Sequence, residues 1–400
     1  MKEGWEYKKI DDISTIVGRI GFRGYTKNDL VSKPELGAIT LSPSNIINGE
    51  LSFEKCSYIS LKKYEESPEI MLAEGDVVLV KTASIGKCSI VRSLPHKATL
   101  NPQFVVFKNI KIDNEYFNYY IKSPYFQKSL KTIVGGVAIP TLSQKKLGQL
   151  EIYFPTSYDE QRRIVSYLDS SFKLIDEIKN KALKSLTEAK ALFQSALAEA
   201  MEPKEGWEEK ALGEIATEMY RGSGIKRDQI TPIGFPCLRY GEIYTTYNYS
   251  FSECISHTNE SIISPKKYFE KGDILFAITG ESVEDIGKCI AYTGKEKCLL
   301  GGDIVAMKHN QYPQFLAYAL STKEAIRQKG LGKVKLKVVH TNIPALKTIR
   351  IYLPNISTQK QIVSHLDKLS SKVRAIEEKY QKMVEECDAL KQAMLRDVFE

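Results

Sequence analysis

An internal repeat of about 200 residues constrains the fold of this chain more than any other feature. The segment QRRIVSYLD, Gln161–Asp169, returns as QKQIVSHLD, Gln359–Asp367, 198 residues later. EGWE at the start of the chain returns at Glu205, so each copy carries one of the two tryptophans, Trp5 and Trp207. A duplicated chain of this length is expected to fold into two similar units.

Each copy begins with about 155 residues that read as mixed α and β. Apolar, β-branched runs between turn residues predict strands over Asp76–Val80, Gln103–Phe107 and Asp273–Ile278. Helical spacing predicts helices near Glu115–Ile133 and Pro313–Lys329. Further echoes in the same order are Gly75–Asp76 with Gly272–Asp273, Ile85–Cys88 with Ile286–Cys289, and Phe117, Tyr120 and Ser123 with Phe315, Tyr318 and Ser321.

A long amphipathic helix is predicted at the end of each copy, over 156–201 and 355–400, after globular domains over 1–155 and 202–354. Ser157–Glu160 and Thr358–Gln361 have capping-box spacing just before each apolar stripe begins. The stripe residues are three or four positions apart, as in a coiled coil. We assign to this seam Ile164, Leu168, Ile175, Ile178, Phe193, Ile362, Leu366, Leu369, Val373, Ile376, Met383 and Leu390.

Antiparallel pairing would let the two stripes bury each other. A helix of about 40 residues is roughly 60 Å long, more than its own domain can cover. The predicted fold class is therefore α+β: two mixed α/β domains separated by an antiparallel coiled coil, with pseudo-twofold symmetry from the duplication. Packing of each helix on its own domain is the alternative.

The composition, 42% apolar and 26% charged, is that of a folded globular protein. The sequence has no apolar run of membrane-spanning length and no signal peptide at its start, so we expect a cytoplasmic chain without a membrane partner. The seven cysteines are scattered singly and the five histidines lack ligand spacing. We therefore expect reduced thiols and no metal site.

A formal net charge of +8 permits a nucleic-acid partner, and the cations cluster in glycine-containing loops and between Ala325 and Arg350. Glycine lets the backbone approach a phosphate, whereas arginine and lysine can donate to guanine edges. A solvated basic turn is the alternative for any single loop. The candidate DNA-binding residues are Arg19, Phe22, Arg23, Tyr25, Lys81, Thr82, Ser84, Lys87, Arg221, Ser223, Lys226, Arg227, Arg239, Tyr240, Lys333, Lys335 and Lys337.

The candidate loops differ between the copies although the framework matches: RIGFRGYT from Arg19 stands where RGSGIKRD from Arg221 stands. Two such domains would read two different sequences.

Catalytic motifs for phosphate binding, metalloprotease or hydrolase chemistry are absent from the sequence. Asn101–Phe104 only superficially resembles a methyltransferase motif, and Gln103 fits the start of a strand better. Glu208–Lys210 and Glu377–Lys379 match half of a nuclease signature and fit solvated charges better. We predict no catalytic residue and no cofactor on this chain.

These residues carry a resemblance to the specificity subunits of type I restriction-modification systems. The two variable domains begin with Gly-Trp and end with an apolar residue and a proline, Pro155 or Pro354, before the Q-x-x-I-V-x-x-L-D helix. The tail Leu390–Phe399 is similar to the usual ending of that family, so the resemblance covers essentially the whole chain.

The resemblance implies two target recognition domains, each reading half of a split, asymmetric sequence in double-stranded DNA. It also implies that the two helices pair as an antiparallel coil. Two modification methyltransferase subunits would dock on this coil, and a restriction and translocase subunit would join the assembly. The partner would methylate a flipped adenine with S-adenosylmethionine. A 60 Å spacer limits the gap between half-sites to roughly 17 base pairs.

Other function classes stay open at this point. A fused methyltransferase-nuclease would need the missing catalytic motifs. A coiled-coil scaffold that binds only proteins would lack the steep salt dependence of phosphate contacts. A stand-alone DNA-binding protein outside restriction-modification is a further alternative.

Overall fold

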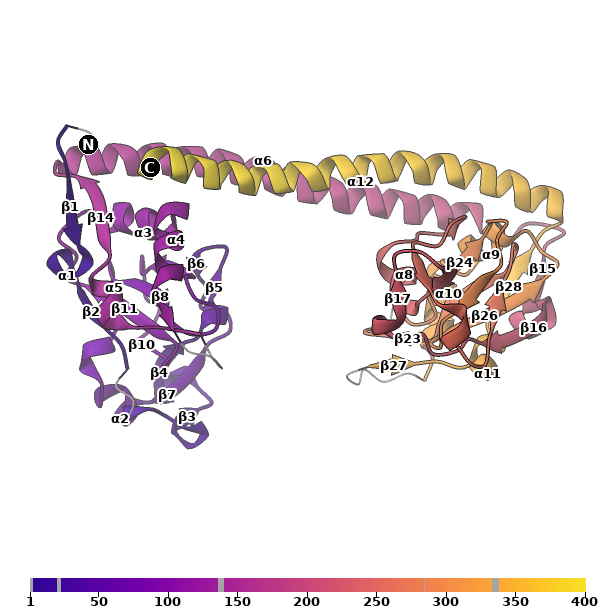
Figure 1. Cartoon of the computed structure of the whole chain (residues 1–400), viewed down its shortest axis with the longest axis horizontal. Helices are drawn as coiled ribbons and strands as arrows, with labels where there is room; N and C mark the ends of the chain where they lie inside the picture. Colours follow the sequence, from indigo (N-terminus) through magenta and orange to yellow (C-terminus); the bar gives the residue numbers. More distant parts are fainter. Residues whose placement is uncertain (1–2, 20–22, 136–139, 284, 333–337) are drawn as a thin grey trace. The chain divides into compact units, whose positions relative to one another are not determined.

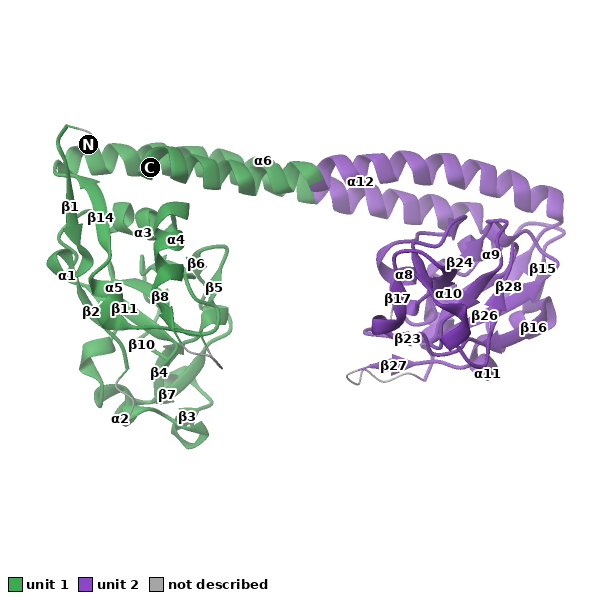
Figure 2. Ribbon diagram, viewed as in Figure 1, with its two compact units in different colours: residues 1–183, 382–400 green, residues 184–381 purple. Residues whose placement is uncertain are grey.

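The computed structural model describes residues 3–19, 23–135, 140–283, 285–332 and 338–400. Two compact units are present: residues 1–183 with 382–400 form unit 1, and residues 184–381 form unit 2 (Figure 2). Each unit contains a β-rich head and a segment of both long helices, α6 (Tyr158–Ala200) and α12 (Ile356–Phe399). The predicted α+β class, with two mixed heads and two long helices, is confirmed. No helix in the described part of the chain is long and apolar enough to cross a membrane.

The head of unit 1 is built on two four-stranded sheets (Figure 1). The first has the order β2 (Thr15–Val17), β11 (Phe104–Lys108), β8 (Val77–Val80), β9 (Cys88–Ile90). The second has the order β10 (Ala98–Leu100), β4 (Gly37–Leu41), β7 (Ser57–Ser60), β3 (Leu30–Val31), with β10 parallel to β4.

The two central strands of the first sheet explain the apolar runs that predicted them. Val78 and Val80 pack in the core between the sheets, whereas Val77 and Leu79 pack in the core beneath the helices. A strand buried on both faces reads as a continuous apolar run rather than as an alternating one. The predicted strands Asp76–Val80 and Gln103–Phe107 are therefore β8 and β11.

Helices α3 (Asn114–Lys122) and α4 (Pro124–Thr132) lie between the first sheet and the long helices (Figure 1). Strand β1 (Trp5–Lys9) pairs antiparallel with β14 (Glu151–Pro155), so the start and end of the head meet where α6 begins. The remaining elements of unit 1 are α1 (Ile10–Ile13), β5 (Ile46–Ile47), β6 (Glu50–Leu51), α2 (Leu61–Glu65), β12 (Val134–Gly135), β13 (Thr141–Leu142) and α5 (Gln144–Gly148).

Unit 2 repeats this plan with two five-stranded sheets. The first has the order β16 (Ala216–Arg221), β26 (Ile304–His309), β22 (Ile274–Ala277), β24 (Cys289–Tyr292), β19 (Ser250–Phe251). The second has the order β17 (Ile230–Thr231), β20 (Ser256–Thr258), β18 (Phe235–Leu238), β25 (Cys298–Leu300), β21 (Tyr268–Phe269). The parallel pair β18 and β25 corresponds to β4 and β10 of unit 1.

The other elements of unit 2 also have counterparts in unit 1. Helices α9 (Pro313–Ala319) and α10 (Lys323–Gly330) correspond to α3 and α4, and β15 (Glu208–Ala211) pairs with β28 (Arg350–Leu353) as β1 pairs with β14. The short elements are α7 (Leu212–Ile215), α8 (Tyr240–Thr245), β23 (Thr279–Gly280), β27 (Val339–His340) and α11 (Ile343–Lys347).

The repeated Q-x-x-I-V-x-x-L-D segment attaches each long helix to its own head. Buried Gln161 accepts a hydrogen bond from the backbone N–H of Asp113 at 2.7 Å and donates to the Pro155 carbonyl at 2.7 Å. Gln359 makes the same two contacts, with the Tyr312 N–H at 3.0 Å and the Pro354 carbonyl at 2.8 Å. The repeat is therefore a structural joint.

The aspartate that ends this segment accepts a second, matched hydrogen bond. The Tyr119 hydroxyl donates to Asp169 at 2.5 Å, and the Tyr318 hydroxyl donates to Asp367 at 2.7 Å. Tyr318 thus corresponds to Tyr119, so the sequence match with Tyr120 was wrong by one residue. The gapless offset of the long helices does not extend into the heads.

The first cap prediction agrees with the structure and the second does not. The Glu160 N–H donates to the Ser157 hydroxyl at 3.5 Å. At α12, the Thr358 N–H donates at 2.9 Å to the side chain of Asn355, because the helix begins at Ile356, before the proposed cap. Asn355 is an equally good cap, so composition alone did not discriminate between the two residues.

The long helices run antiparallel inside each unit. In unit 1, Lys179 contacts Asp388 and Lys391 contacts Asp176, each at 2.6 Å. In unit 2, Phe193 shares a core cluster with segments of α12. Buried members of the predicted seam are Leu168, Ile175, Phe193, Leu366 and Val373, and half-buried ones are Ile164, Ile362, Leu369 and Met383.

Three predicted seam residues are wrong. Ile178 and Ile376 are each 42% exposed and Leu390 is 51% exposed. The residue that follows Leu390, Lys391, turns inward instead: its side chain is 21% exposed, and its ammonium lies 5.1 Å from the centre of the Phe172 ring. An apolar stem with a paired charge occupies the seam there, which a search for apolar residues misses.

Candidate nucleic-acid interface

Parallel pairing brings two loops together at one edge of each head. Leu41 lies opposite Leu100 in unit 1, and Leu238 lies opposite Leu300 in unit 2. Because parallel strands end at the same edge, the loops that follow are neighbours. We call this region the parallel-pair edge; it comprises Ser42–Asn45 and Asn101–Gln103 in unit 1, and Arg239–Gly241 and Gly301–Asp303 in unit 2.

The parallel-pair edge of unit 2 holds a cavity of about 350 Å³. Three predicted DNA-binding residues line it: Arg227, Arg239 and Tyr240. The rest of the lining is Gly224, Ile225, Gly241, Gly301, Gly302 and Asp303. A Cβ at Gly301 would lie 2.5 Å from the Leu238 carbonyl oxygen, so no larger residue fits there without displacing backbone. The cleft is therefore lined by glycine backbone and by cationic side chains.

Carboxylates hold two of the three arginines at this edge. Arg239 Nε lies 3.4 Å from Glu242, which is buried and also accepts the Arg239 N–H at 3.2 Å. Arg221 bonds to Asp303 at 2.7 Å at the rim. Within the described residues, Arg227 is exposed and has no carboxylate partner. Two oriented guanidiniums and one free guanidinium suit an anionic, planar ligand such as a nucleotide.

Unit 1 presents the Gln103 amide and two serine hydroxyls at the same edge, and Asn101, which is buried, supports Gln103. The Asn101 side chain donates to Gln103 at 3.0 Å and accepts the Gln103 N–H at 2.9 Å. The Ser42 and Ser44 hydroxyl oxygens are 2.7 Å apart. The sequence search did not assign these four residues to the site, because only the pairing of β4 with β10 brings them together.

Arg19 is a correction to the predicted interface. It is 5% exposed, and its Nε donates to the Leu100 carbonyl at 3.1 Å. In unit 2 the equivalent carbonyl, that of Leu300, accepts the backbone N–H of Ser223 at 2.9 Å. Arg19 therefore satisfies a backbone carbonyl inside the head and does not face solvent. Ser223 is likewise wrong as a DNA contact, since it is 7% exposed and its hydroxyl donates to the Pro265 carbonyl.

The other candidates of unit 1 are scattered. Arg23 lies 3.5 Å from Glu69, and the Tyr25 hydroxyl accepts from Thr40 at 3.3 Å. Burial lowers the pKa of Lys81. The Thr82 hydroxyl is 3.4 Å from that of Thr141, Ser84 and Lys87 are exposed in the turn between β8 and β9, and Phe22 lies outside the described residues.

In unit 2, Lys226 is exposed beside Arg227. The basic residues Lys333, Lys335 and Lys337 lie outside the described part of the chain.

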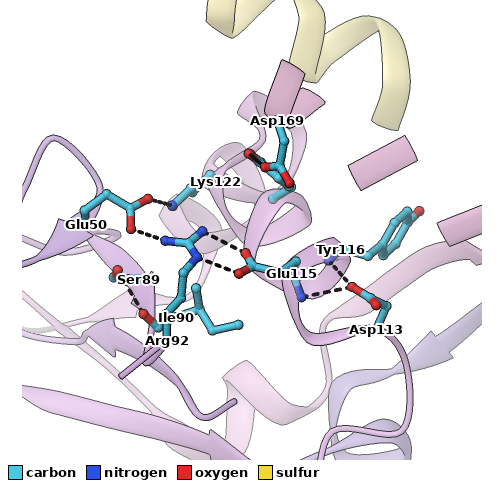
Figure 3. Close-up of polar contacts among 10 residues, drawn as sticks. Glu50, Ser89, Ile90, Arg92, Asp113, Glu115, Tyr116, Lys122 and Asp169 are labelled. Carbon is cyan, nitrogen blue, oxygen red and sulfur yellow. Dashed lines mark hydrogen bonds and ion pairs between the residues drawn. The ribbon is translucent and has the colours of Figure 1, made fainter. Parts of the chain in front are cut away.

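Two cations in and beside α3, Lys122 and Arg92, are paired with carboxylates of their own head. Figure 3 shows Arg92 between Glu115, at 2.6 Å, and Glu50, with Lys122 also 3.6 Å from Glu50. Carboxylates on two sides of Arg92 would repel a phosphate. This cluster therefore stabilises the head and is not part of the interface.

Comparison with known proteins adds the family. The sequence profile of the type I restriction modification DNA specificity domain matches residues 2–188 and again residues 204–386. The specificity subunit of type I restriction enzyme MjaVIII from Methanocaldococcus jannaschii is 27% identical over 201 residues, which are 49% of this chain and 45% of that protein. The MjaIX specificity subunit from the same organism is 26% identical over 305 residues, 70% of this chain and 67% of that protein. The chain thus spans less than half of the first relative's length.

Two solved structures share the fold. A chain from a study of complex assembly and conformational transition of the type I R-M system superposes with a TM-score of 0.72 at 19% identity, over 100% of this chain and 98% of that one. The HsdS subunit from Thermoanaerobacter tengcongensis has a TM-score of 0.51 at 18% identity, over 100% and 97%. Because both copies of the repeat match one domain profile, the chain belongs to the type I restriction modification DNA specificity domain family, as a specificity subunit with two recognition domains.

Proposed function

We propose that this chain binds a bipartite, asymmetric target in double-stranded DNA and directs partner subunits to it. The parallel-pair edge is the main support for this proposal. The two heads form it from the same strand pairing, but the side chains that they place there differ. In unit 2, Arg227 and Arg239 face a glycine-lined cleft, and guanidinium pairs with guanine and phosphate. In unit 1, the half-buried Gln103 presents an amide, which the buried Asn101 holds by a hydrogen bond at 3.0 Å, and amides pair with adenine. The two half-sites are therefore different sequences.

The partners in this proposal are two modification methyltransferase subunits, which bind S-adenosylmethionine and methylate adenine, and a restriction and translocase subunit. The chain supplies the address and carries neither catalytic residue nor cofactor. Such a complex works in the cytoplasm, where its DNA is.

The long helices set the gap between the half-sites in this proposal. Each runs for more than forty residues without a break, which corresponds to about 60 Å and roughly 17 base pairs as an upper bound. Inserting one heptad into both helices lengthens the preferred gap. An unchanged gap in a map of methylated sites would contradict this part of the proposal.

The function is tested by expressing the chain with its methyltransferase and mapping methylated adenines across a genome. A two-part motif with dissimilar halves is the expected result. A continuous or palindromic motif would refute the proposal. Methyl transfer by the purified chain alone would show instead that the chain is an enzyme.

A binding assay tests the edge itself. Arg227→Ala should weaken binding to duplex DNA and reduce the slope of log affinity against log salt by about one. Arg374→Ala removes the same charge from an exposed ion pair on α12 of the same unit and serves as the control. Equal salt slopes for the two variants would remove Arg227 from the interface, and salt-independent binding by the wild type would favour a protein scaffold.

A further inference from the structure

Unit 2 has an open groove at a place that aromatic side chains occupy in the described part of unit 1. The groove has a volume of about 830 Å³ and lies between the last turn of α6, the start of α10 and the β15–β28 pair. Its lining belongs entirely to unit 2.

The equivalent place in unit 1 is filled by aromatic side chains of the chain itself. The Tyr120 ring lies 5.8 Å from Phe126, 6.3 Å from Tyr125 and 5.4 Å from Phe399, measured between ring centres. Beside them, Tyr7 stacks on Tyr153 at 4.4 Å with 20° between the ring planes. These rings close the junction between head and helices.

Structural equivalence shows what replaces these rings in unit 2. Four matches fix the alignment of unit 1 with unit 2. They are the tyrosines Tyr119 and Tyr318, the caps Ser123 and Thr322, the strand registers, and the repeat of the long helices. The replacements are Glu209 for Tyr7, Ala319 for Tyr120, Glu324 for Tyr125, Ala325 for Phe126 and Met201 for Phe399. All five replacing residues line the groove, so the lost aromatic volume accounts for it.

The floor of the groove keeps one aromatic ring exposed. Tyr352, the counterpart of Tyr153, is 41% exposed, whereas Tyr153 is 8% exposed beneath its neighbours. Ala198, Ala319 and Met201 add apolar wall. A ring brought from outside could stack on Tyr352 as Tyr7 does on Tyr153, and stacked aromatic pairs stabilise interfaces.

The rim of the groove is acidic. It carries Glu199, Glu202, Glu209 and Glu324 against Lys323 and Arg350. Arg350 holds Glu209 at 3.1 Å, and Arg327 holds Glu324 at 2.8 Å. Within the described residues, Glu199 and Glu202 have no cationic partner. An occupant with positive charge beside its ring would complement the rim.

We propose that this groove docks a segment of the modification subunit in which an aromatic side chain is flanked by lysine or arginine. The inference rests on the proposed assembly with modification subunits. It further implies that two identical subunits bind the chain unequally, because in the described residues the junction of unit 1 is closed by its own rings.

The test fills the groove with the side chains that unit 1 already uses. The variant Ala319→Tyr with Ala325→Phe should bind the purified modification subunit at least tenfold more weakly at one of two sites in calorimetry, with the other site unchanged. Thr217→Tyr adds a ring at an exposed position of the same head, outside the groove, and should leave both sites unchanged. The melting temperature verifies that each variant folds.

A charge variant keeps the inference testable if the filled variant does not fold. Glu199→Gln with Glu202→Gln should weaken the same site several-fold at low salt and less at high salt. Wild-type affinity at both sites in both groove variants would overturn the docking groove and leave the proposed function intact. Failure of the wild type to bind any modification subunit would refute the proposed function itself.

Discussion

Replacing Gln359 should loosen the joint between α12 and the head of unit 2. Its side chain is fully buried and bonds to the Tyr312 N–H, the Pro354 carbonyl and, at 2.8 Å, Gln311. Gln359→Met keeps an unbranched chain of similar size but removes all three bonds. The N–H of the half-buried Tyr312 and the carbonyl of the buried Pro354 then lose this partner.

The expected cost follows from these orphaned groups. A buried donor or acceptor without a partner costs about 1–3 kcal/mol, so the variant should lose about 3 kcal/mol of unfolding free energy. Gln161→Met orphans the same kind of pair in unit 1 without a third bond. We therefore expect a smaller loss for Gln161→Met than for Gln359→Met.

The placement of the two tryptophans allows each unit to be measured by itself. Trp5 contacts Tyr153 in unit 1, and Trp207 contacts Phe315 in unit 2. In a Trp5→Phe background, urea unfolding followed by fluorescence reports unit 2 alone. Gln361→Met, an exposed position on the same helix, is the matched control and should lie within about 0.5 kcal/mol of the parent.

A charged variant gives an independent check by pH. Gln359→Glu still accepts from Tyr312, but burial raises the pKa of the new carboxyl in the folded state. Its stability deficit should be large at neutral pH and should shrink as the pH falls, because the protonated acid donates again to the Pro354 carbonyl. If Gln359→Met matches Gln361→Met, or if the deficit of Gln359→Glu does not depend on pH, the glutamine does not hold this joint.

Two further predictions concern unit 2. Burial lowers the pKa of His309 to about 4, and its Nδ1 accepts the Gln311 N–H at 3.0 Å. The unfolded histidine takes up its proton near pH 6.5. The free energy of unfolding should therefore fall by up to about 3 kcal/mol between pH 6.5 and 4. His309→Asn should remove that dependence in urea midpoints measured against pH, and equal profiles would disprove it. On α12, Val373→Gln should lower the free energy of unfolding by about 2 kcal/mol, because Val373 is buried. Ile376→Gln should lower it by less than about 0.5 kcal/mol, because Ile376 is exposed. Thermal melts that rank the two variants the other way would return Ile376 to the seam.

The long helices and the buried strands could be predicted because their signals are local. A stripe of apolar residues every three or four positions defines a helix wherever it packs. The seam was harder: Ile178 and Leu390 fit the spacing, yet Lys179 and Lys391 turn inward because Asp388 and Asp176 face them across the helix pair. A charged residue can be assigned to a seam only when the oppositely charged residue that faces it is known.

The interface shows the same division. Arg19 and Arg227 both stand in basic, glycine-containing loops, but Arg19 is buried against the Leu100 carbonyl and Arg227 lines an open cleft. Burial depends on which strands pair, and β4 and β10 are separated by dozens of residues. The sequence did not indicate Gln103 as a residue of this edge for the same reason.

The sequence by itself determined the duplication, the α+β class, the two long helices and the family, because these depend on order, period and motif along the chain. Only the tertiary structure decided which cations reach solvent, which residues share the parallel-pair edge, and why unit 2 is open where unit 1 is closed by rings. Those properties arise from contacts between residues far apart in the sequence, and each is set by a partner that the local sequence does not contain.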